Sequence, residues 1–121
     1  MTVKLVYCCR RKPGMSLEEF HKYWLEMHGG LAIRLREKMP GMKRYVQSHT
    51  LPGAATDMLQ TSRGAREAFD GITEAWFDSV ESMADGGEDA QVAAVAMLED
   101  EAEFLDLPNC VVFLTEEHEI F

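Results

Sequence analysis

The chain has 121 residues, of which 46% are hydrophobic and 27% are charged, which is typical of one globular domain over residues 1–121 and not of a disordered or fibrous chain. The net charge of −9 argues against nucleic acid and anionic membranes as partners. No apolar run approaches a membrane span, and the first residues lack a signal-peptide pattern. A cytoplasmic protein is therefore expected. The three cysteines are odd in number, lie in strand-like segments and form no C-x-x-C pair, so we expect them to be buried, reduced thiols.

The first half of the chain predicts a strand, a long helix and a second strand. Residues 3–11 alternate as a strand does, and a helix is expected over 13–39. Ser16 and Glu19 have the spacing of a capping box, which marks the start of this helix. Its apolar residues recur every three or four positions and predict one core-facing stripe: Phe20, Trp24, Met27, Leu31 and Leu35.

The second half predicts two more strands and one more long helix. Strands are expected over residues 42–51, 71–79 and 107–120, with a long exposed loop over 52–70. One helical turn is expected over 80–84, and a helix with a strongly acidic solvent face over 89–104. This order predicts an α+β fold of the ferredoxin-like split βαβ type, a four-stranded antiparallel sheet with two helices on one face.

The first, third and last strands carry apolar residues on both faces. An antiparallel sheet with helices on one face and water on the other would alternate cleanly. We therefore expect the second face to pack against a second copy of the chain, giving a homodimer with its sheets face to face.

Four segments together resemble the EthD family of the dimeric α/β-barrel superfamily. They are KLVYCCRRKPGMSLEEFHKYWLEMHG, GMKRYVQSHTL, FDGITEAWFDSVESM and FLDLPNCVVFLTEEHEI, and they cover nearly the whole chain. The resemblance implies a ferredoxin-like protomer, a dimer whose two sheets close into a barrel, and a ligand cavity between each sheet and its own helices. The family includes a protein tied to ether degradation, a lactone isomerase and polyketide-tailoring enzymes.

His28 is the leading catalytic candidate, because imidazole is the side chain best suited to proton transfer near neutral pH. It follows Trp24 by four residues and precedes two glycines, so it could equally be a packed, hydrogen-bonded histidine at a helix joint. Further catalytic candidates are Tyr45 and His49, and the candidate ligand-binding residues are Tyr7, Trp24 and Trp76. A polar patch at the dimer interface is the alternative interpretation for Tyr7, Tyr45 and His49.

No metal or cofactor site is expected, since the chain has no phosphate-binding glycine loop, nucleophile elbow or dinucleotide fingerprint. The hypothesis is a cofactor-independent enzyme that performs acid/base chemistry on a small apolar, lactone or aromatic substrate, as an isomerase, dehydratase, cyclase or oxygenase. The alternative is a non-catalytic dimer that binds a small molecule or serves as an accessory protein.

Overall fold

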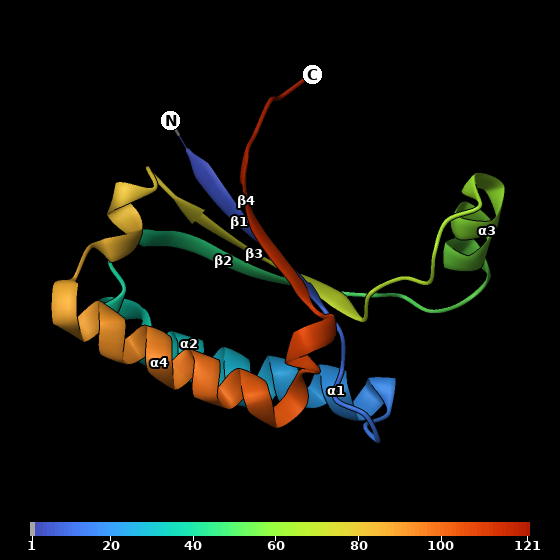
Figure 1. The fold of residues 1–121 in the computed structure, drawn as a ribbon, viewed down its shortest axis with the longest axis horizontal. Helices are drawn as coiled ribbons and strands as arrows, with labels where there is room; N and C mark the ends of the chain where they lie inside the picture. The colour runs from blue at the N-terminus through green and yellow to red at the C-terminus, as the bar shows by residue number, and fades with distance from the viewer. Residues whose placement is uncertain (1) are drawn as a thin grey trace.

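The computed structural model describes residues 2–121, in which four strands form one antiparallel sheet. The strands are β1 (Val3–Cys9), β2 (Met42–His49), β3 (Gly71–Phe77) and β4 (Val111–Glu116), in the spatial order β2-β3-β1-β4. Helices α1 (Leu17–Tyr23), α2 (Gly29–Leu35) and α4 (Gly87–Phe104) all lie on one side of the sheet (Figure 1). The predicted α+β, ferredoxin-like fold is confirmed.

Strand register decides which side chains face the helices. Tyr7 lies opposite Thr73 on β3, and Thr73 in turn lies opposite Gln47 on β2, so the three share one face of the sheet. The intervening positions, such as Val6, point to the other face, which no helix covers (Figure 1). The first four residues of β4, Val111–Leu114, are all apolar and between 44% and 56% exposed, and two of them, Val111 and Phe113, lie on this uncovered face.

The first helical segment begins as predicted but is not continuous. The Ser16 hydroxyl accepts a hydrogen bond from the Glu19 amide at 3.0 Å, and the Glu19 carboxylate accepts one from the Ser16 amide at 3.2 Å, which confirms the capping box. Between α1 and α2 lies a π-helical turn, Trp24–His28, in which the Gly29 amide donates to the Trp24 carbonyl five residues back. The Gln47 side-chain amide donates to the same carbonyl at 2.8 Å.

The π turn changes which residues face the core. A turn closed by an i→i+5 bond holds one residue more than an α-helical turn, so the position stacked next to Trp24 passes from Met27 to His28. Met27 is 58% exposed and His28 only 4%. The predicted stripe is therefore correct for Phe20 and Trp24 but wrong for Met27.

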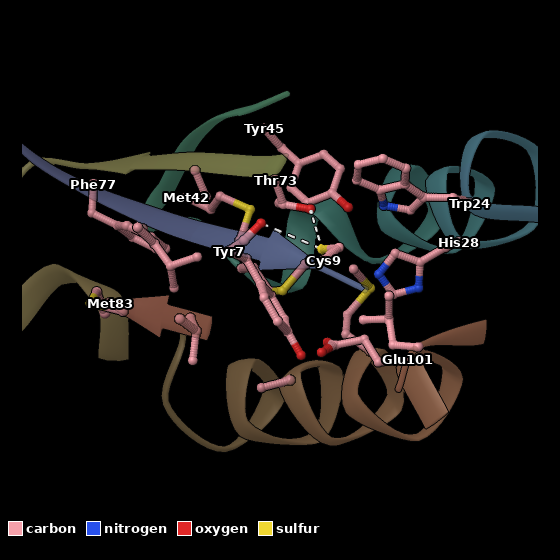
Figure 2. Close-up of a pocket in the computed structure, with 18 of the residues that line it drawn as sticks. Tyr7, Cys9, Trp24, His28, Met42, Tyr45, Thr73, Phe77, Met83 and Glu101 are labelled. Atoms are coloured by element: carbon pink, nitrogen blue, oxygen red, sulfur yellow. Dashed lines mark hydrogen bonds between the residues drawn. The ribbon is translucent and has the colours of Figure 1, made fainter. Parts of the chain in front are cut away.

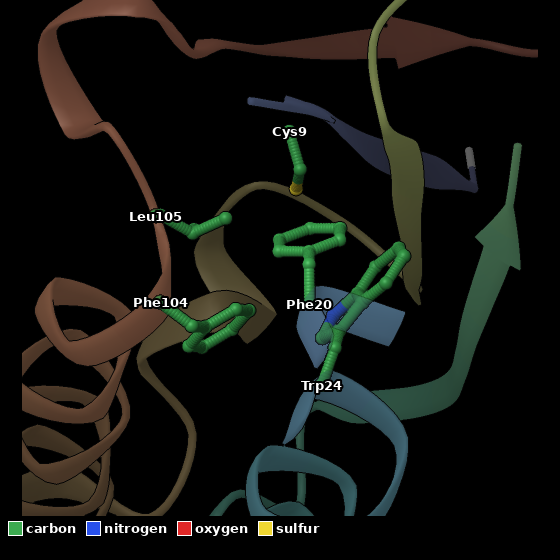
Figure 3. Packing of buried hydrophobic residues seen from close by; sticks show 5 residues of the cluster. All are labelled: Cys9, Phe20, Trp24, Phe104 and Leu105. Atoms are coloured by element: carbon green, nitrogen blue, oxygen red, sulfur yellow. The ribbon is translucent and has the colours of Figure 1, made fainter. Parts of the chain in front are cut away.

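The apolar core sits where α1, the π turn and the end of α4 meet β1. It consists of buried side chains, shown in Figure 3: Cys9, Phe20, Trp24, Phe104 and Leu105. Gly71 at the start of β3 makes this packing possible, because a Cβ there would lie 2.3 Å from Cζ3 of Trp24. The indole therefore packs directly on the β3 backbone.

The stretch 52–70 is exposed as predicted but is not only a loop. It contains helix α3 (Ala54–Arg63), none of whose residues is buried, and which stands apart from the rest of the molecule in Figure 1. The helix ends at Gly64, which adopts the left-handed conformation with φ 59°. The expectation of an exposed loop over the whole stretch was therefore wrong for residues 54–63. The helix has no core to face, so its sequence lacks the apolar periodicity from which a helix is predicted.

The remaining elements match the prediction in order, but the last strand is shorter than the predicted 107–120: β4 spans Val111–Glu116, because residues 107–109 form a 3₁₀ turn and residues 117–121 lie beyond the strand pairing. The turn after β3 is a 3₁₀ helix, Glu81–Ala84, and α4 begins two residues earlier than expected. A 3₁₀ turn, Leu107–Asn109, precedes β4. Within residues 2–121, no helix has the length and apolar character needed to cross a membrane.

Candidate functional site

A cavity of about 290 Å³ lies between the inner face of the sheet and the helices (Figure 2). The sheet supplies one wall, the π turn and α4 supply the other, and the turn before β2 closes one end. Most of the lining is apolar: Leu5, Trp24, Met39, Met42, Ala75, Phe77, Met83, Ala90, Ala94, Met97, Phe104, Leu105 and Val112. The polar side chains that reach it are few: Tyr7, Cys9, His28, Tyr45, Thr73 and Glu101.

His28 is held at the cavity wall by a carboxylate from the opposite helix. Its Nδ1 atom lies 2.7 Å from Oδ2 of Asp100 on α4. The second carboxylate oxygen of Asp100 accepts a hydrogen bond of 2.6 Å from the Tyr23 hydroxyl. Tyr23, at the end of α1, thus orients the carboxylate, and Asp100 orients the imidazole.

This pairing determines what the imidazole offers to the cavity. A carboxylate accepts hydrogen bonds, so Nδ1 of His28 carries a proton and, in the neutral ring, Nε2 is the basic nitrogen. Nε2 has no hydrogen-bond partner among residues 2–121, and the ring borders the cavity. The arrangement has the geometry of a carboxylate–histidine dyad whose free nitrogen can take or give a proton.

Glu101 follows Asp100 on α4 and faces the cavity instead of solvent. Burial raises the pKa of its carboxyl group, although the nearby Tyr7 hydroxyl and His28 act in the opposite direction. In Figure 2 the Tyr7 hydroxyl points toward this carboxyl group. Burial also raises the pKa of Tyr7, so its hydroxyl stays protonated.

Among residues 2–121 the Tyr45 hydroxyl forms no well-aligned hydrogen bond, although the side chains of Gln47 and Thr73 lie close enough to act on its pKa. Its Oη atom is buried and has no hydrogen-bond partner among the residues that the structure describes. Burial raises the pKa of Tyr45. The Cys9 thiol lies close to the Thr73 hydroxyl, at 4.0 Å, and burial raises its pKa to about 12, so it is a neutral lining group and not a nucleophile.

The structure brings together four of the six residues singled out from the sequence: Tyr7, Trp24, His28 and Tyr45 all line the cavity. It does not bring His49 there. That imidazole stacks on the Trp24 indole, with ring centroids 4.5 Å apart, and its Nε2 lies 2.9 Å from the Gln47 side-chain oxygen. Burial and the neighbouring His21 lower the pKa of His49.

Trp76 also lies away from the cavity, on the uncovered face of the sheet. Its indole N–H donates a 2.6 Å hydrogen bond to Glu117, and the Arg44 guanidinium lies 4.7 Å from the ring centroid. The predicted ligand-binding role of Trp76 therefore finds no support in its position.

Sequence reasoning missed Tyr23, Asp100 and Glu101. The acidic residues of α4 were taken together as a solvent face, but the helix buries Ala93, Met97 and Phe104 toward the sheet. Asp100 and Glu101 fall at the three- and four-residue spacing between Met97 and Phe104. Two carboxylates at positions where the apolar pattern expects core residues could have indicated that Asp100 and Glu101 face inward.

A second hollow of about 610 Å³ lies outside the sheet edge, between α2 and β2. Cationic side chains line part of it: Arg36, Lys43 and Arg44. It contains no histidine, cysteine or carboxylate, so it offers no acid/base chemistry. Among residues 2–121, no group of three or more histidine, cysteine, aspartate or glutamate side chains could hold a metal ion.

Fold and site together define a ferredoxin-like protein with an internal, largely apolar cavity and a histidine–carboxylate pair in its wall. Residues 12–108 match the EthD domain family, and the chain belongs to that family. No curated protein sequence matches the chain.

Solved structures with the same fold are distant in sequence. An EthD-like protein from Ralstonia eutropha is 21% identical, with a TM-score of 0.60, over 95% of this chain and 90% of that one. A hydroxynitrile lyase from Passiflora edulis is 19% identical, with a TM-score of 0.63, over 99% and 96%. A protein from Thermobifida fusca described as dimeric and ferredoxin-like is 17% identical, with a TM-score of 0.59, over 97% and 92%.

Proposed function

We propose that this protein is an enzyme that binds a small, largely apolar molecule in the internal cavity and transfers a proton through His28. The observation that carries the proposal is the 2.7 Å contact between His28 Nδ1 and Asp100, which leaves the second ring nitrogen toward the cavity. A histidine that served only to fill the core would be expected to have both nitrogens paired within the protein.

The surroundings suit general acid/base catalysis. The cavity wall is mostly apolar, so water competes weakly for the imidazole and a proton transfer there is directed at the ligand. Asp100 holds the ring in one tautomer and stabilises the imidazolium formed when Nε2 takes a proton. A relative with the same fold is described as a hydroxynitrile lyase, which supports this fold as a scaffold for catalysis.

The chemistry that these residues supply by themselves is proton removal at one atom and proton return at another. Isomerisation, dehydration and cyclisation of a carbonyl compound or lactone need no more than this. We therefore propose a cofactor-independent reaction of one of these types, on a substrate small enough for a cavity of about 290 Å³.

We further propose that the working form is a homodimer built on the uncovered sheet face. The half-exposed side chains of Val111 and Phe113 on β4 support it, as does Ile72 on β3, because all three share the uncovered face of the sheet and such an apolar surface is costly to leave in water. A relative from Thermobifida fusca is described as dimeric. The three free cysteines suit a reducing compartment, and we propose a cytoplasmic location.

The test has two stages. A thermal-shift screen with ketones, lactones and phenols finds ligands, and those that bind are then assayed for conversion. Replacing His28 with Asn should lower turnover by about 10²–10⁴-fold while the protein still folds. The matched control is Glu99→Gln, on the exposed side of α4, which should leave turnover unchanged. Ligands that bind without conversion would assign the protein a binding role instead, and full turnover in His28→Asn would refute the role of His28 in catalysis.

A further inference from the structure

The cavity has a polar end and an apolar end. In Figure 2, His28, Tyr45 and Glu101 lie toward the end beside Trp24, whereas Met42, Phe77 and Met83 gather at the opposite end. Tyr7 crosses the space between them, with its hydroxyl at the polar end. A ligand that fills the cavity must therefore place its polar group beside His28 and its apolar body toward Phe77.

The charges of the lining restrict that polar group. No lysine or arginine is among the residues that line the cavity, and its single carboxyl side chain is that of Glu101. An anionic ligand would lose its hydration there and find no cation to replace it. It would also meet the carboxylate of Asp100 behind His28. A neutral ligand meets neither cost.

Two groups at the polar end are arranged to donate hydrogen bonds. The Tyr45 hydroxyl is buried and has no well-aligned hydrogen bond among residues 2–121, with the side chains of Gln47 and Thr73 near it, and buried hydroxyls in folded proteins are nearly always paired. Burial raises the pKa of Glu101, which favours the protonated carboxyl group, a donor as well as an acceptor. An uncharged ligand atom with two lone pairs can accept a hydrogen bond from the Tyr45 hydroxyl and another from the Glu101 carboxyl group.

We propose that the cavity takes a neutral ketone, with its carbonyl oxygen accepting from Tyr45 and Glu101 and its apolar body directed toward Phe77. The following step rests on the acid/base role of His28 proposed above. Nε2 of His28 removes a proton from the carbon next to the carbonyl, that C–H electron pair forms the C=C bond of an enol, and Glu101 gives its proton to the oxygen. In a β,γ-unsaturated ketone this enol is a dienol. The His28 imidazolium then delivers the proton to the γ-carbon, the C=C bond shifts into conjugation, and Glu101 takes the hydroxyl proton back as the carbonyl re-forms, which is an isomerisation that needs no other reactant.

The ligand class is tested with matched probes that differ in charge. Acetophenone is compared with benzoate, and 2-acetylnaphthalene with 2-naphthoate, by NMR titration of the parent protein at pH 7.5. We expect each carboxylate to bind at least about tenfold more weakly than its ketone, because it brings a charge that the lining cannot pair. Equal or tighter binding of the carboxylates would overturn the proposal, as would failure of both ketones to bind.

Variants test the assigned donors. Tyr45→Phe should weaken ketone binding by up to about tenfold, the effect of losing one hydrogen bond, and should leave carboxylate binding as weak as before. Glu101→Gln removes the acidic proton and should narrow the difference between ketone and carboxylate, while its control Glu99→Gln should not. Unchanged ketone binding in Tyr45→Phe would overturn the placement of the carbonyl oxygen.

The proton step has its own readout. In D₂O the parent protein should accelerate deuterium incorporation into the ketone methyl group, and His28→Asn and Glu101→Gln should each lose that acceleration by about 10²-fold or more. Selective ketone binding without deuterium incorporation would refute the acid/base role of His28 but uphold the ligand class. Selective binding of carboxylates would refute the ligand class whatever His28 does.

Discussion

Replacement of Asp100 by Asn isolates the role of the carboxylate behind His28. The two side chains have nearly the same shape, so the Asn oxygen can still accept from Tyr23, and its amide must then face Nδ1 of His28. Both contacts are short in the parent protein, 2.7 Å to His28 and 2.6 Å to Tyr23. Because an amide donates where a carboxylate accepts, Nδ1 must lose its proton and Nε2 must gain one.

The expected changes follow from these two bonds. A hydrogen bond to a charged group contributes about 1.5–3 kcal/mol and a neutral one about 0.5–1.5 kcal/mol. Asp100→Asn replaces two bonds of the first kind, to His28 and Tyr23, with two of the second kind, so it should lower the free energy of unfolding by about 2 kcal/mol. The loss of activity should be far larger, about 10⁴-fold, because the wrong tautomer presents a donor where a base is needed. Glu99→Gln should change neither quantity.

The tautomer can be measured without a substrate. Two-dimensional ¹⁵N NMR of the imidazole at pH 9, above the range in which an ordinary histidine is charged, distinguishes a protonated Nδ1 from a protonated Nε2. The parent protein should show a protonated Nδ1 at His28, and Asp100→Asn should show a protonated Nε2. The same tautomer in both proteins would refute the idea that Asp100 orients the ring.

Three further predictions concern stability and assembly. Trp24→Ala should lower the free energy of unfolding by about 3–5 kcal/mol in urea titrations, and a loss below about 1 kcal/mol would show that the indole is not a core residue. Phe113→Glu should shift the dimer to monomer in sedimentation experiments at micromolar concentration, and a protein that is monomeric from the start would contradict the proposed interface. The raised pKa of Glu101 makes folding bind a proton, so stability should fall as pH rises from about 4.5 through the folded-state pKa, and Glu101→Gln should remove this fall in pH-dependent unfolding experiments.

Features that depend on neighbours in sequence could be predicted well. The capping box of Ser16 and Glu19 joins residues three apart, and the strand–helix order follows from periodicities of two and about four residues. The four predicted strands all exist, and their order in the chain was enough to give the sheet topology. His28 was found because it stands beside an apolar stripe.

Features that depend on contacts between segments distant in sequence could not be predicted. The π turn is supported by Gln47 on β2, and the position of His28 by Asp100 on α4, 72 residues later. His49 shares the inward face of β2 with Tyr45, as the alternation predicted, but the cavity ends before it because the Trp24 ring packs against His49. The residues of a strand face are set by its alternation, but which of them reach a cavity is set by what packs above them.

The bond from Gln47 to the Trp24 carbonyl also has a mechanical meaning. Gln47 lies two residues from Tyr45 on β2, and Trp24 begins the turn that ends at His28, so this bond ties the strand that carries Tyr45 to the helix that carries His28. At the other end of the same turn, Asp100 ties His28 to α4. The sheet and α4 are thus both hydrogen-bonded to the same helical turn, Trp24–His28. A ligand that pushes β2 away from the helices must first stretch the bond from Gln47 to Trp24, and only then does it displace His28.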